Sequence, residues 1–373
     1  MGILRLYLAL CVVHAHAGKL IPWPAQDGPQ AVQMFFMISG FYMSMVCGGR
    51  YGSVSDFYKS RALRIYIPYY FYFLIILAAS ICSGIFGHKW LALDAYASQP
   101  LASTGMSGIV AASVANVTIF GLDWLMFFDS PPGGGLHFIL DFTKGSLPLY
   151  NYFVIPQCWS IGIELTFYAI VPFFAVMRKR GILGILLVLL GLRFAVYSKY
   201  HLDVDPWNYR FFPFELALFL AGMLAQKLYS EYCNSVPTIR KTGVIFLIFL
   251  AAAVVSGGFL LNRVACYFAL HTGIPNAGFF SVLAIAPCLP VLFHLTRNSR
   301  MDRWLGELSY PIYLNHLILV LAFLAWIPGL ANSDWLGILV ALCSITWAAF
   351  ANRFIFSPFE VWRHAIFGIK TQS

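Results

Sequence analysis

The first eighteen residues of the chain contain three ionisable side chains in an otherwise apolar run: Arg5, His14 and His16. Ionisable groups are costly within a membrane span and usually serve a function there. A histidine titrates near neutral pH and is suited to removing a proton from a hydroxyl group as a general base. On a helix, residues eleven apart differ by about 20° around the axis and about 16 Å along it. Arg5 and His16 therefore share a face that His14 does not, and His16 is the candidate base.

Two other interpretations of this segment stay open. Arg5 at a helix end is also expected to reach the membrane surface, with His16 as a structural residue near water. Residues 1–17 also contain the parts of a signal peptide, including the cleavage pattern Ala15-His16-Ala17. The apolar part of such a peptide is at the short limit, so we favour a retained first span.

Glu164 is the second candidate for chemistry. It lies near the start of the apolar segment 159–177, which is expected to enter the membrane from the side that holds His16. A buried carboxylate needs a partner, and His16, Arg210 and Ser160 are the candidates; Ser160 lies one helical turn away. We predict that Glu164 orients or charges His16, with a structural ion pair inside the membrane as the alternative.

The eight cysteines are scattered singly, with neither a CxxC pair nor a Cys/His ligand spacing. They are typical of small buried side chains, so the sequence predicts no metal site.

The elements that must position these residues are predicted to be transmembrane helices. The chain has 373 residues, of which 60% are hydrophobic and 10% charged, whereas soluble domains carry about 25% charged residues. Apolar runs of about twenty residues recur along its length, which predicts an all-α polytopic membrane bundle. The chain has a net charge of +9, but its basic residues form no tail, so nucleic acid is not an expected partner. The expected spans are 4–17, 32–48, 65–87, 159–177, 181–196, 211–228, 243–261, 278–295, 308–327 and 335–356.

Lys and Arg clusters set the number of spans, because such clusters stay on the cytosolic side. Ten spans place every cluster and both termini on that side. One further apolar segment, 106–128, is interrupted by Asn116 and Asp123. A single crossing there would move all later clusters outward, so we expect 106–128 to be re-entrant, interfacial, or paired with a second crossing near 134–156. The SPPGGGLHF stretch within the latter region indicates a turn. Residues 1–373 are expected to form one membrane domain with no appended soluble domain.

Several segments, in this order, resemble the integral-membrane acyltransferase-3 family, which acylates sugars and other acceptors. Besides the Arg5 to His16 spacing, they are VQMFFMISGFYM (32–43), KSRALRIYIPYY (59–70), CWSIGIELTFYAIVP (158–172), RFFPFELALFLAGMLA (210–225) and LGELSYPIYLNHLIL (305–319). The chain departs from the family pattern at Gln33, where Asp is common, at Gly162, where Ser is usual, and at Ala31, where Gly is usual. A role of that Asp cannot be transferred.

The resemblance implies an O-acyltransferase of the cell membrane that moves an acyl group, expected to be acetyl, to a hydroxyl of a sugar or glycan. The donor would be acetyl-CoA or another acyl-CoA, a cosubstrate and not a bound cofactor, and the acceptor a glycan or lipid-linked sugar. His16 would be the general base, assisted by Glu164.

The expected donor site is basic, because coenzyme A carries phosphates that arginines bind well. Arg5, Lys59, Arg61 and Arg64 are its candidates, although such residues also fix topology and contact anionic lipids. His316 is expected to contact the pantetheine arm, or else to bond Tyr313 or Asn315 in helix packing. The residues expected to line the acceptor side, each with a structural alternative, are Ser39, Trp159, Ser160, Arg210, Glu215 and Tyr313.

The alternative function is a transporter or flippase for a lipid-linked sugar or a small solute, in which the charges inside the membrane form its path. The absence of a sequence repeat disfavours it. A non-catalytic membrane scaffold is a third possibility, but it has no need of His16 and Glu164.

Overall fold

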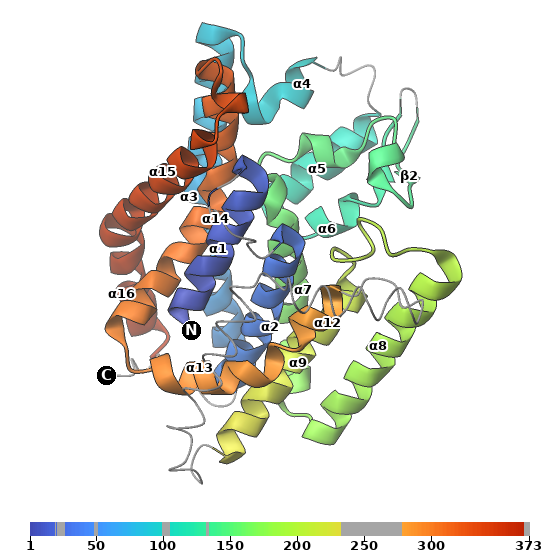
Figure 1. Ribbon diagram of the computed structural model, residues 1–373, viewed down its shortest axis with the longest axis vertical. Helices are drawn as coiled ribbons and strands as arrows, with labels where there is room; N and C mark the ends of the chain where they lie inside the picture. The colour runs from blue at the N-terminus through green and yellow to red at the C-terminus, as the bar shows by residue number, and fades with distance from the viewer. Residues whose placement is uncertain are drawn as a thin grey trace.

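The computed structural model of the chain describes residues 1–18, 20, 27–47, 51–98, 105–131, 134–232 and 278–368. The elements in these residues are almost all helices (Figure 1), because a helix satisfies its backbone hydrogen bonds within the segment. The longest are α1 (Gly2–Ala17), α2 (Gly28–Cys47), α3 (Val54–Gly87), α7 (Trp159–Ala175), α8 (Lys179–Tyr200), α9 (Phe212–Tyr232), α14 (Arg300–Trp326) and α15 (Trp335–Ala351).

Shorter elements connect them. The short α-helices are α4 (Asp94–Ser98), α5 (Met106–Thr118), α6 (Leu122–Leu125), α12 (Gly278–Leu283), α13 (Leu289–Thr296) and α16 (Ser357–Ile366). The strands are β1 (Phe128–Asp129) and β2 (His137–Phe138), and the single turns are η1 (Leu91–Leu93), η2 (Phe142–Lys144), η3 (Leu149–Tyr152), η4 (Pro156–Cys158), η5 (Ala286–Cys288), η6 (Leu330–Asn332) and the π-turn η7 (Asn352–Phe356).

The predicted all-α polytopic fold is confirmed. Within the described residues, six helical stretches are long and apolar enough to cross a membrane: Gly28–Cys47, Val54–Gly87, Pro156–Ala175, Lys179–Tyr200, Arg300–Trp326 and Trp335–Ile366. Gly2–Ala17, Met106–Thr118 and Ala286–Thr296 are shorter apolar helices. The expected span 243–261 lies outside the described residues, so the number ten stays a prediction.

The expected span 278–295 is not one continuous helix. It is divided into α12, η5 and α13, with Pro287 in η5 and Pro290 in the first turn of α13. Proline removes a backbone donor and clashes with the preceding turn, which explains the interruption.

Two close helix contacts form the centre of the bundle. The first joins α1 and α14, which run parallel. The terminal amine of Met1 lies 2.7 Å from Asp302 Oδ2, and a Cβ at Gly2 would stand 1.5 Å from the Asp302 carbonyl oxygen. The second joins α2 and α9, where a Cβ at Gly40 would stand 2.0 Å from the Phe219 carbonyl oxygen. Glycine permits both approaches, as in other membrane helix pairs.

Different elements form the two ends of the bundle (Figure 1). The start of α1 and the end of α16 lie at one end, together with the first turns of α3 and α14. We call this the basic end, and define it by Arg5, Arg61, Arg64 and Arg363. The opposite end, the cap, is formed by α4, α5, α6 and the β1–β2 hairpin.

The segment 106–128 does not continue as one helix. Its helix α5 has 13 residues, about 20 Å in length, against the roughly 30 Å hydrocarbon core of a bilayer. The last carbonyls of α5 accept hydrogen bonds from three tyrosines of α3, including Tyr70 Oη to the Val117 oxygen at 2.7 Å and bonds from Tyr66 and Tyr69. These tyrosines lie within the apolar run of α3 that begins at residue 65, which favours the re-entrant alternative.

The region 134–156 contains strand and single-turn elements and no α-helix in its described residues. Phe128 pairs with Phe138 and Asp129 with His137, so the chain reverses direction between two short strands in the region where the sequence predicted a turn. Asn116 fastens α5 to this region, because its amide donates to the Tyr152 oxygen at 2.8 Å and accepts from the Val154 amide at 2.9 Å. The polar interruption of the apolar segment is therefore a structural link.

Candidate active site

His16 and His316 form a pair at the end of α1 that points away from the basic end. His16 Nδ1 lies 3.1 Å from His316 Nε2, and the ring centroids are 5.1 Å apart. His16 is exposed, whereas His316 is fully buried within α14. The pair exists because α1 and α14 run parallel, so that residues 2 and 302 meet at one end and residues 16 and 316 at the other.

Carbonyl oxygens determine which ring nitrogens carry hydrogen in the neutral pair. His316 Nδ1 lies 2.9 Å from the Tyr313 oxygen and 3.2 Å from the Ile312 oxygen. A carbonyl only accepts, so His316 Nδ1 is the donor and its Nε2 presents a lone pair. His16 Nδ1, 3.0 Å from the Val12 oxygen, then donates to both acceptors. The lone pair of His16 is thereby on Nε2, for which the described residues provide no hydrogen-bond partner.

His14 has a different task. Its Nδ1 accepts a hydrogen bond from the Leu20 amide at 3.0 Å, beyond the end of α1. The helical phase predicted that His14 and His16 face different ways, and the structure separates them in this manner.

Arg210 and Trp159 lie near the histidine pair. The Arg210 guanidinium is 4.3 Å from the Trp159 ring centroid and close enough to act electrostatically on His16. Burial alone would lower the pKa of Arg210, but Tyr209 and Asp205 raise it above its ordinary value, so the guanidinium stays charged.

Arg210 and Glu215, both expected on the acceptor side, pair with other residues and not with each other. Arg210 Nε bonds Asp205 Oδ1 at 2.6 Å within the loop that precedes α9. Glu215 in the first turn of α9 faces Arg193 of α8, with Nη1 to Oε1 at 3.1 Å and both side chains buried. Arg210 lies before the helix begins, so helical spacing does not relate it to Glu215. Arg193 was missed, although an arginine inside the apolar segment 181–196 is itself a signal.

Glu164 is bonded to partners other than those expected. Ser39 Oγ and Tyr168 Oη each donate to Glu164 Oε1 at 2.5 Å, and the two hydroxyls lie 3.2 Å apart. In the described residues no hydrogen bond or ion pair joins Glu164 to His16, Arg210 or Ser160. The direction of its side chain on α7 explains this: the carboxylate meets α2 and the next turn of its own helix. Ser39, expected on the acceptor side with a structural role as the alternative, is one of its donors.

Ser160 and Tyr313 are bonded to each other instead. Their hydroxyl oxygens are 2.7 Å apart, and Tyr313 Oη donates to the Gln157 carbonyl at 2.8 Å. Tyr313 also interacts electrostatically with both Glu164 and Arg210.

The basic end contains arginines without ion-pair partners. Arg5 interacts electrostatically with Arg64, Glu164 and Tyr168, yet within the described residues neither Arg5 nor Arg64 has an acidic oxygen within ion-pair distance. Arg61 donates to Tyr51 Oη at 3.2 Å, and its buried Nε has no partner there. Lys59, the remaining donor candidate, is exposed two residues before Arg61 on α3.

Together these groups form a polar lane through the bundle. We define it by Arg5, Arg64, Glu164, Tyr168, Tyr313, Ser160, Arg210, His16 and His316. Hydrogen bonds join Tyr168 to Glu164, Tyr313 to Ser160, and His16 to His316. The other links are electrostatic: Arg5 and Arg64 act on Tyr168, Glu164 and Arg210 act on Tyr313, and Arg210 acts on His16. The lane leads from the basic end to the histidine pair.

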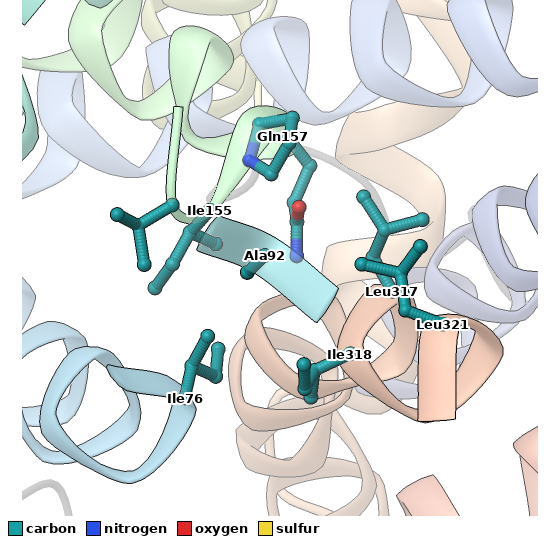
Figure 2. Close-up of a pocket in the computed structure, with 9 residues that line it drawn as sticks. Ile76, Ala92, Ile155, Gln157, Leu317, Ile318 and Leu321 are labelled. Carbon is teal, nitrogen blue, oxygen red and sulfur yellow. The ribbon is translucent and has the colours of Figure 1, made fainter. Parts of the chain in front are cut away.

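A small cavity next to α14 is not part of this lane. It has a volume of about 10 Å³, room for one water molecule, and lies among Ile76, Ile155, Gln157, Leu317, Ile318 and Leu321 (Figure 2). Leu317, Ile318 and Leu321 lie about 100° to 200° around the helix from His316. The cavity is therefore behind α14 relative to His16. Gln157 Oε1 is buried without a partner in the described residues, and its Nε2 donates to the Tyr313 oxygen at 3.0 Å.

A polytopic helical bundle with a polar interior defines the chain as an integral membrane protein. The model of the acyltransferase-3 family, described as an acyltransferase domain, matches residues 1–353. The chain belongs to this family and is a membrane acyltransferase, as the ordered motifs predicted. It is also similar to a protein of Aquifex aeolicus (strain VF5) that is named only as uncharacterized, with 23% identity over 170 residues, 45% of this chain and 71% of that protein. No solved structure matches the chain significantly.

Proposed function

We propose that the chain is an O-acyltransferase that takes an acetyl or other acyl group from acyl-CoA and transfers it to a hydroxyl of a glycan or lipid-linked sugar. The coarser activity, acyl transfer in a membrane, follows from the family. The polar lane is the observation that supports the finer proposal, since it joins arginines suited to phosphate binding at one end to a candidate base, His16, at the other.

The donor is proposed to bind at the basic end. Arg5, Arg61 and Arg64 have donors that protein carboxylates do not occupy in the described residues, and exposed Lys59 adds charge at the rim. Phosphates suit such a set because guanidinium groups bind them with two parallel hydrogen bonds. The thioester arm would then follow the lane over the roughly 16 Å between residues 5 and 16 of α1.

The reaction proposed at the other end uses His16 as the base. Its Nε2 takes the proton of the acceptor hydroxyl while that oxygen attacks the thioester carbonyl carbon. The carbon–sulfur bond then breaks, and the proton passes to the leaving thiolate, which gives an ester and free coenzyme A. Arg210 and Trp159 lie where they would hold an acceptor, since aromatic and guanidinium groups suit sugar binding.

In this proposal Glu164 does not orient or charge His16, the role that the sequence suggested. It neutralises part of the charge of Arg5 and orders Ser39 and Tyr168 along the lane, while Ser160 and Tyr313 continue the lane toward His16. Glu215 holds Arg193 and supports the loop that carries Arg210.

The test measures coenzyme A release from acetyl-CoA, labelled in the acetyl group, by protein purified in nanodiscs. We expect His16→Ala to lower kcat about 100-fold or more, the usual contribution of a general base, and His14→Ala to retain wild-type turnover. Equal turnover in both variants would remove His16 as the base. Absence of turnover in the wild type, also after crude membrane glycans are added, would contradict the donor or the acceptor class.

The donor site has its own matched pair of variants. We expect Arg64→Gln to raise the KM for acetyl-CoA about tenfold, which corresponds to the loss of about 1.4 kcal/mol of binding. Arg180→Gln removes an exposed arginine of α8 that is not part of the proposed donor site, and it is expected to leave KM unchanged. An unchanged KM in Arg64→Gln contradicts this donor site.

A further inference from the structure

We propose that His316 is a positioning residue that fixes His16 in the state with its Nδ1 protonated and its Nε2 free. The inference rests on the proposed function, because His316 has this task only where His16 is the base. In this role His316 positions His16 and does not contact the pantetheine arm of the donor.

Burial separates the roles of the two histidines. His316 is 0% exposed and is enclosed by α14 and its neighbours, whereas His16 is exposed at the end of α1. An acceptor molecule is therefore able to reach His16 and not His316. His316 therefore acts on the reaction only through His16, whose Nδ1 lies 3.1 Å from His316 Nε2.

Backbone carbonyls hold the buried ring in one orientation. The oxygens of Ile312 and Tyr313 both accept from His316 Nδ1, which leaves Nε2 as an acceptor directed at α1. The Tyr313 oxygen is itself fixed by the Gln157 amide at 3.0 Å. The lone pair of His316 Nε2 is thus held in the direction of His16. Groups that bond the second ring nitrogen of a metal-bound or catalytic histidine usually fix its tautomer in this way.

The charged groups near His16 favour a neutral partner. Arg210 is the group that acts electrostatically on His16, and it is already paired with Asp205. In the described residues no carboxylate bonds His16, so His316 is its one side-chain partner there. A neutral imidazole orients His16 without a further charge inside the membrane, where an unpaired charge is costly.

Two isosteric substitutions test which nitrogen of His316 matters. The amide of His316→Gln places an acceptor near the position of Nε2, whereas the amide of His316→Asn occupies the position of Nδ1. We expect His316→Gln to retain kcat within about tenfold of the wild type, and His316→Asn and His316→Leu to lose about 100-fold, since a base in the wrong tautomer loses most of its contribution. The KM for acetyl-CoA should stay unchanged in all three variants.

Controls separate this inference from the proposed function and from misfolding. His16→Ala in the same assay reports the base itself: if it keeps full activity, the proposed function fails in its choice of base. If His16→Ala is inactive and His316→Leu is fully active, only the present inference is overturned. If Gln, Asn and Leu at 316 all lose activity equally, or raise the donor KM, His316 is structural or a donor contact and the inference is also overturned. Thermal unfolding and size exclusion of each variant in nanodiscs identify any that do not fold.

Discussion

His14 and His16 stand two residues apart, and their different partners show how far helical phase alone assigns a side chain. The phase was sufficient to separate them, because a straight helix of known period needs no tertiary information. It was not sufficient for Glu164, since the expected serine at i−4 and the observed tyrosine at i+4 both lie on its face. Tyr168 was available in the sequence as a partner, but Ser39 required knowledge of how α2 packs on α7.

Glu164→Gln tests the new place of this residue. The amide oxygen can still accept from Ser39 and Tyr168, so the fold should persist, but the charge that acts on Arg5 is lost. We expect a lower KM for acetyl-CoA, by up to about tenfold, because Arg5 then presents its full charge to the donor phosphates, and little change in kcat. Steady-state kinetics beside Arg5→Gln provide the measurement. A large loss in kcat with unchanged KM would instead support the earlier pairing of Glu164 with His16.

At the scale of elements, α2 connects the two halves of the site. Ser39 reaches Glu164 on α7, Gly40 permits the close contact with α9, and Gln33 donates to both oxygens of Glu215 at 3.0 and 3.1 Å. Arg193 completes this buried network and donates to the Asn208 oxygen in the loop that carries Arg210. The network therefore supports the loop from which Arg210 acts electrostatically on His16.

The same network explains why Gln33 is suited to its position, where related sequences commonly have Asp. Glu215 already provides the carboxylate for Arg193, so Gln33→Asp would place a second one beside it and remove the amide donor. We expect a loss of about 3–5 kcal/mol in stability, the range for an uncompensated buried charge.

The double variant Gln33→Asp, Glu215→Gln is the matched control, because it restores one carboxylate for Arg193. Its thermal unfolding in detergent is expected to recover most of the stability that the single variant loses. If Gln33→Asp unfolds at the wild-type temperature, the buried carboxylate of Glu215 does not determine the residue at 33.

At the scale of the whole molecule, local signals predicted the elements and packing determined their partners. The apolar runs gave most helices to within a few residues, because length and hydropathy are properties of a segment. Pro287 and Pro290 are themselves a sequence signal for the interruption of the span 278–295. Helix α3 begins at Val54, earlier than the apolar run at 65. The His16–His316 contact was not predictable from spacing, since it depends on α1 and α14 lying parallel at one register.

The orientation of the molecule in the membrane is the last prediction. The start of α1 and the end of α16 lie at the same end of the bundle (Figure 1), which also contains the arginines of the basic end. The positive-inside rule places such an end in the cytosol. We expect an impermeant maleimide to label Leu136→Cys at the cap on intact cells, and Met301→Cys at the basic end only after permeabilisation; both positions are exposed. The variants are made in a background without the eight native cysteines. Labelling of Met301→Cys on intact cells would show that the orientation is the opposite of the one predicted. It would also place the proposed donor site outside the cell, where acyl-CoA is not supplied, so this result would contradict acyl-CoA as the donor as well.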